Sequence, residues 1–298
     1  MANEILTSNL ERVDSILSST RLLLLADRAI MGAHPAILEA GDVAGTGSNV
    51  IKVRRLGLDG YNALASATEI QDLTNIAFVD ASTNVTVGRY SVSHDASTIS
   101  MGTDPELDWA RFAQSLLTDA LTYETTLAAA LATGFSDSLG TDATEMSLTT
   151  LLTATSTLEA ANVPGPYLFV GHSAHIRGLR LEQLLGVAGQ MQYQPPAGVQ
   201  VGTGYKGRVP VIDVDVFQTN RSPSSGSGYA GMLVGQGAIA RAHMTPPVSD
   251  PSRQRAMGNI LIEYGRDPGA TIDQYHAHLY VGFVENDDAR GVQIICKA

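Results

Sequence analysis

The chain has 298 residues, of which 44% are hydrophobic and 16% charged, and its net charge at pH 7 is −11. This composition is typical of a globular protein and argues against one that grips nucleic acid through a basic face. No apolar run approaches the ~18 residues of a membrane-spanning helix, and the N-terminus lacks a signal peptide, so we expect a protein made in a cytoplasm without a membrane partner.

The first third of the chain predicts a helix, an irregular segment and then strands. Ser8 begins a capping box that opens a helix to about residue 31. The glycine-rich residues 34–49 predict no regular element. Alternating patterns over residues 49–56 and 76–98 enclose a long polar excursion. This arrangement predicts an extended β-hairpin that projects from the body.

The most strongly predicted element is a long helix in the middle of the chain. Asp104 is its expected cap, followed by a proline and an acidic residue, and Gly134 ends it. Apolar residues recur at steps of three and four between these ends. About 30 residues at 1.5 Å each give roughly 45 Å, which suggests a strut. A second helix is expected over residues 147–161.

The remaining chain predicts strands with one further helix. The apolar run at residues 167–170 leads into a helical stripe over residues 174–185. A strand is expected over residues 209–217. Three strand candidates then follow in series, at residues 259–267, 273–284 and 292–298.

One short stretch resembles the active-site turn of a serine hydrolase. A strand runs into Gly171, His172 and Ser173, as in the nucleophile elbow G-x-S-x-G. The final glycine of that motif is replaced by His175. Ser173 also stands at the start of a predicted helix, where a serine caps the first turn. We therefore favour the cap, and a serine-directed probe that labelled Ser173 would support a hydrolase instead.

The other catalytic-looking motifs are weaker. Residues 202–207 and 235–240 match a dinucleotide-binding glycine pattern by count, but neither lies between a strand and a helix. His276 and His278 share one face of a strand and could ligate a metal, but no third ligand is predicted. The single cysteine, Cys296, excludes an intrachain disulfide. We expect no catalytic centre, cofactor or metal.

The order of elements resembles the major capsid protein of tailed bacteriophages, which has the α+β Hong Kong 97-type fold. "YLFVGHSAHIRGLR" is similar to the strand and helix of its A-domain, and "YKGRVPVIDVDVF" to the strand that carries L-x-G-x-P-V. The resemblance covers nearly the whole chain. By this resemblance the parts are an N-arm (1–48), an E-loop hairpin (49–80), a P-domain (81–134 and 240–287) with a long spine helix (about 104–133), and an A-domain (135–239 and 288–298).

The resemblance implies a structural protein, not an enzyme. Copies of such a chain self-assemble into hexamers and pentamers of an icosahedral shell that encloses double-stranded DNA. Its further partners are a portal, and scaffolding and decoration proteins where they are used. It is assembled in the cytoplasm of the bacterial host and ends in the virion. An acidic wall suits this role, because it limits non-specific sticking to the packaged DNA.

The resemblance also implies contacts between copies. Residues 56–75 have too little apolar periodicity for the core of their own subunit, so we expect them to pack on a neighbour. Some members of the family weld their shells through an E-loop lysine. Here the E-loop holds only Lys52, at its base, so a non-covalent shell is expected. The candidate interface residues are Arg54, Arg55, Asp59, Glu69, Asp72, Arg253 and Arg255.

Three alternatives stay open beside the capsid protein. An encapsulin shell has the same fold and encloses cargo enzymes, so the contents of purified shells would distinguish it. A phage tail or decoration subunit is disfavoured by the long helix. The third alternative is the serine hydrolase. The chain begins near the expected start of a mature coat protein, so a fused scaffolding leader is not expected.

Overall fold

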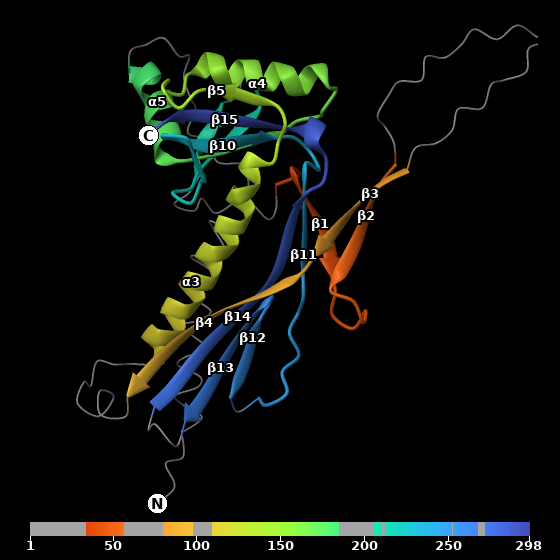
Figure 1. Cartoon of the computed structure of the whole chain (residues 1–298), viewed down its shortest axis with the longest axis vertical. Helices are drawn as coiled ribbons and strands as arrows, with labels where there is room; N and C mark the ends of the chain where they lie inside the picture. Colours follow the sequence, from red (N-terminus) through yellow and green to blue (C-terminus); the bar gives the residue numbers. More distant parts are fainter. Residues whose placement is uncertain are drawn as a thin grey trace, which may run out of the picture.

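The computed structural model describes residues 34–56, 80–97, 109–184, 205–209, 212–251, 253–267 and 272–298. These residues form an α+β structure with two main sheets and a separate hairpin. In Figure 1 one sheet lies with helices α4 and α5 at one end of the molecule, and the other extends away from it beside helix α3. Several predicted features lie outside the described residues, namely the N-terminal helix with Ser8, the residues Asp59, Glu69 and Asp72, and the Asp104 cap.

The first sheet, here called the β14 sheet, is built on one long strand. Within β14 the odd-numbered residues Tyr275 to Val281 are buried, and His276 and His278 are half-buried on the other face. This alternation is the predicted one. The strands of the sheet are β1 (Ile37–Asp42), β4 (Gly88–Ser97), β11 (Ile239–His243), β12 (Gln254–Met257), β13 (Ile260–Asp267) and β14 (Ile272–Glu285).

Helix α3 (Trp109–Ala130) covers the apolar face of this sheet. Its buried residues Leu117 and Leu121 pack in one cluster with Leu279 and Val281 of β14. A 3₁₀ turn, η1 (Leu131–Thr133), follows, and the Gly134 N–H donates to the Leu131 carbonyl at 2.9 Å. The helix therefore ends where the glycine predicted. Its 22 described residues span about 33 Å.

The second sheet, here called the β10 sheet, is covered by α4 (Leu148–Ala160) and α5 (Ser173–Leu184). Helix α4 begins as predicted, because the Ser147 hydroxyl accepts the Thr150 N–H at 3.0 Å. The strands of this sheet are β5 (Ser138–Gly140), β6 (Tyr167–Gly171), β7 (Tyr205–Val209), β8 (Val214–Gln218), β9 (Ser224–Ser225), β10 (Gly228–Val234) and β15 (Gly291–Lys297).

Two predictions about strands need correction. Residues 209–217 were expected as one strand, but β7 and β8 pair antiparallel and the chain reverses at Asp213, whose φ is +53°. A proline at position 210 is the sequence signal for that break. Residues 34–49 were expected to be irregular, but they contain β1, which pairs parallel with β11. The predicted hairpin is present, with Val50 paired to Thr86 at its base.

The two main sheets share an apolar cluster. Ala132 and Phe135, at the end of the helical segment, pack with Val170 of β6 and Met232 of β10. Ile239 of β11 joins the same cluster. Because the buried side chains are continuous from one sheet to the other, the two sheets form one packed unit.

Candidate assembly interface

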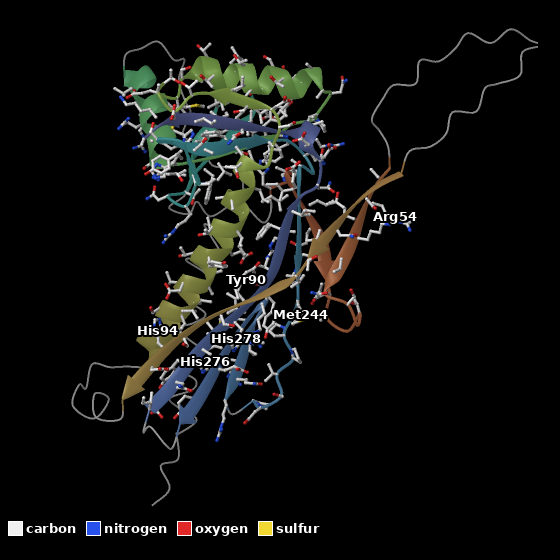
Figure 2. The ribbon with its side chains drawn as sticks, viewed as in Figure 1. Arg54, Tyr90, His94, Met244, His276 and His278 are labelled. Atoms are coloured by element: carbon white, nitrogen blue, oxygen red, sulfur yellow. The ribbon has the colours of Figure 1, made fainter. Side chains whose placement is uncertain are left out.

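The hairpin is made of β2 (Val50–Leu56) and β3 (Asp80–Thr86). Its base is anchored, because Val53 and Val85 are buried in a cluster with Ala240 and Ala242 of β11. The opposite face of β2 carries Val50, Lys52 and Arg54, all exposed. Figure 2 shows Arg54 on the outer side of the hairpin. One face of the hairpin is therefore left uncovered by the rest of the described chain.

The other predicted interface arginines lie on a different part of the molecule. Arg253 directly precedes the edge strand β12, and its side chain is 66% exposed with Asp250 at 3.9 Å. Arg255 lies within β12 opposite Ile262 of β13. The backbone of Arg55 pairs with Ala81 in the hairpin. The described members of the predicted set therefore do not gather into one site within a single chain.

Sequence reasoning missed a charged network between the helix and the β14 sheet. The guanidinium of Arg241 donates from Nε and Nη2 to Glu124 Oε1 of α3, at 3.1 and 2.9 Å. It also pairs with Glu39 of β1, which in turn lies 2.7 Å from His243 Nδ1. Burial alone would lower the pKa of Arg241, but Glu124 and Glu39 outweigh it and raise that pKa. The partners are remote in sequence, so no local pattern indicated them.

The serine predicted as a helix cap is displaced from that role. Helix α5 begins at Ser173, and the Ala174 N–H donates to Nδ1 of His172 at 3.3 Å. The His172 N–H donates in return to Nδ1 of His175 at 3.1 Å. This is a reciprocal capping box in which imidazole nitrogens replace the usual oxygen atoms. The prediction that Ser173 is the cap is wrong by one residue, because a histidine ring can also accept the orphan N–H.

The same contacts disfavour a serine nucleophile. Burial lowers the pKa of His175 to about 4, and its second ring nitrogen lies 3.0 Å from the Ile294 carbonyl. His172 stacks on Tyr229 with ring centroids 3.6 Å apart. The Ser173 hydroxyl lies 3.4 Å from His172 Nδ1, the atom that already accepts the Ala174 N–H. Both histidines thus serve the helix start.

Comparison with known proteins gives a result at the level of structure. No family model matches the sequence, and no curated protein is significantly similar to it. The capsid structure of the cyanophage P-SCSP1u is similar with a TM-score of 0.60 and 8% identity, and the match covers 87% of each chain.

The chain has the fold of a phage capsid protein. The capsid of Ralstonia phage GP4 is similar with a TM-score of 0.56 and 11% identity, over 88% of this chain and 87% of that one. The SrpI encapsulin of Synechococcus elongatus is similar with a TM-score of 0.51 and 15% identity, over 83% of this chain and 81% of that one. The capsid fold is therefore shared by the phage and encapsulin alternatives.

The predicted histidine pair lies on the β14 sheet of this capsid fold. His276 and His278 are two residues apart on the same face of β14, and their ring centroids are 6.1 Å apart (Figure 2). His278 is hydrogen-bonded to Ser91 Oγ at 2.6 Å and to Glu263 Oε2 at 3.1 Å. Across the described ranges, no three or more His, Cys, Asp or Glu residues form a group that could hold a metal ion.

Two further observations concern chemistry and membranes. Cys296 is buried in the β10 sheet, and burial raises the pKa of its thiol to about 11. A thiol that stays protonated at neutral pH is a poor nucleophile and a poor metal ligand. Within the part of the chain that the structure describes, no helix is long and apolar enough to cross a membrane.

The cap of α5 gives a first testable prediction. Ser173→Ala should change the free energy of unfolding by no more than about 0.5 kcal/mol, because its hydroxyl does not cap the helix. His172→Ala should cost about 1–3 kcal/mol, through loss of the cap and of the ring stacking on Tyr229. Urea denaturation of the unassembled subunit measures both. A larger loss in Ser173→Ala than in His172→Ala would restore the serine cap.

Proposed function

We propose that this chain is the major capsid protein of a tailed bacteriophage, and that its copies assemble into an icosahedral shell. The observation that carries the proposal is the likeness to phage capsids over 87% of both chains. In this proposal the copies form hexamers and pentamers around double-stranded DNA. The protein is then structural, and its place is the virion, after assembly in the host cytoplasm.

The parts of the family fold have counterparts in this chain. The β2–β3 hairpin corresponds to the E-loop, and α3 to the spine helix. The β14 sheet corresponds to the P-domain, and the β10 sheet with α4 and α5 to the A-domain. The arrangement in Figure 1 supports this assignment, because the hairpin forms a two-stranded sheet of its own at the side of the β14 sheet.

The charges of the chain suggest how the copies meet. Arg54 and Arg253 are exposed on separate elements, as contacts with two different neighbours require. The loop residues Asp59, Glu69 and Asp72 offer carboxylates to arginines of the next copy. Each exposed ion pair contributes only about 0–1 kcal/mol. Because each ion pair would be repeated many times around a closed shell, the pairs together would stabilise the shell.

The remaining partners follow from the same role. A portal, and scaffolding and decoration proteins where the phage has them, would contact the shell. The net charge of −11 suits weak and non-specific contact with packaged DNA. The second candidate is an encapsulin-type shell around a protein cargo, which the likeness to the SrpI encapsulin favours.

Expression of the chain tests the assembly. The purified protein should form capsomers and closed shells, visible by negative-stain electron microscopy and fast-sedimenting in the ultracentrifuge. Shells isolated from infected cells should hold nuclease-protected DNA, whereas a protein cargo would favour the encapsulin. A protein that stays a monomer or dimer under every assembly condition would contradict both shell proposals.

A further inference from the structure

One buried histidine ties the first turn of α5 to the β10 sheet. The side chain of His175 has no exposed surface. Its Nε2 lies 3.0 Å from the Ile294 carbonyl of β15, and its Nδ1 lies 3.1 Å from the backbone nitrogen of His172. A carbonyl only accepts and an amide N–H only donates. The neutral ring, with its proton on Nε2, is therefore the form that satisfies both partners.

The ring is tightly enclosed by two further strands. Its edge meets Phe169 of β6, with ring centroids 5.7 Å apart. A Cβ on Gly231 of β10 would lie 3.1 Å from Nε2, and one on Gly171 would lie 3.2 Å from the His175 Cβ. A larger residue than glycine at either position would crowd His175, so the histidine ring has little free space around it. A proton added to Nδ1 would face the His172 N–H with no space to turn away.

Few titratable groups face the site. Directly before the helix, His172 is the group whose charge acts on His175. On the helix itself, Arg177 is half exposed beside Glu145. From β10, Tyr229 stacks on the His172 ring. From β15, Cys296 lies two residues beyond Ile294, as a thiol with a raised pKa. From β6, Phe169 and the glycine at its end carry no charge. No carboxylate of the described residues is among the groups that act on His175. The hydrogen bond to the Ile294 carbonyl favours the charged ring, but burial outweighs it and lowers the pKa of His175.

We propose that the turn from His172 to His175 is an acid-sensitive latch. Protonation of His175 at Nδ1 removes the acceptor for the His172 N–H and releases the first turn of α5 from the β10 sheet. The proton comes from solvent when the turn opens. His172 acts in the same direction, because its Nδ1 accepts the Ala174 N–H only while that atom is unprotonated.

The direction of the pH effect follows from the two states of the latch. In the closed state burial holds the pKa of His175 at about 4, below its ordinary value of 6.5. Between these values the open state binds more protons than the closed state, so opening becomes easier as the pH falls. The two pKa values predict that the opening equilibrium rises about fifty-fold from about pH 7 to about pH 4.5.

Hydrogen exchange of the unassembled subunit tests the latch. The amides of His172, Ala174 and Ile176 should lose about fifty-fold in protection factor between about pH 7 and about pH 4.5. In His175→Gln the amide side chain can accept from His172 and donate to Ile294, but it gains no proton. That variant should lose much less protection at the lower pH, because only His172 can still gain a proton. Equal protection of the native chain at both pH values, or an equal loss in both proteins, would overturn the proposal.

A second measurement applies if His175→Gln does not fold. The native chain labelled with ¹⁵N-histidine reports the tautomer and titration of each ring by NMR. His175 should carry its proton on Nε2 and titrate below about pH 5. Titration near the ordinary value, or a proton on Nδ1, would show that the ring is not latched.

Discussion

A subunit whose β2–β3 hairpin is cut short should fold normally and fail to build shells. Leu56 pairs directly with Asp80, so an Asn-Gly turn can join these two residues in place of residues 57–79. Val53 and Val85 keep their places in the core cluster at the base. Folding should therefore be preserved, while contacts with neighbouring copies are lost. Electron microscopy measures the shells, and urea denaturation measures the stability of the subunit.

The matched controls keep the full length and remove one charge each. Asp59→Asn, Glu69→Gln and Asp72→Asn should still form shells, because single exposed ion pairs contribute only about 0–1 kcal/mol. Shells of normal size from the shortened chain would show that the hairpin does not join subunits. An unfolded shortened chain would instead show that the removed segment belongs to the core of its own subunit.

Arg241→Met should destabilise the subunit by about 3–5 kcal/mol, because it leaves the carboxylate of Glu124 buried without its cation. Glu124 is only 5% exposed, and it lies on α3, where the helix covers the sheet. A neutral side chain of similar length keeps the volume but not the charge. The free energy of unfolding of the unassembled subunit, from urea titration, is the quantity to measure.

Two further variants show whether the buried charge is the cause. Glu39→Gln should cost no more than about 1 kcal/mol, since the Glu39 side chain is 39% exposed. Combining Arg241→Met with Glu124→Leu should recover most of the loss, because a packed apolar pair can replace a buried ion pair. If the double variant is no more stable than Arg241→Met, the loss comes from packing and not from the loss of the ion pair between Arg241 and Glu124.

Local patterns in the sequence predicted much of the fold. The alternation around His276 and His278 predicted β14, and the apolar steps of three and four predicted α3 up to Gly134. Ser147 was a sufficient signal for the start of α4. Each of these features depends on residues close together in the sequence, so a short segment is enough to predict it.

The features that the sequence did not predict depend on distant or unusual partners. Strand β1 forms because β11, about two hundred positions later, offers it an edge. Arg241 finds its carboxylates on α3 and β1, and no local pattern links them. The α5 cap uses His172 where oxygen-bearing residues are the usual signal. The proposed interface is still harder to predict from the sequence, because its expected partners would belong to other copies of the chain.

The apolar cluster shared by the two sheets couples the direction of α3 to the β10 sheet. The end of the helical segment is fixed in that cluster by Ala132 and Phe135, so its direction is coupled to the β10 sheet. Over the roughly 33 Å of the described helix, a tilt of about 2° moves the far end by about 1 Å. A small rotation of α3 relative to the β10 sheet therefore moves the far end of the helix by about 1 Å.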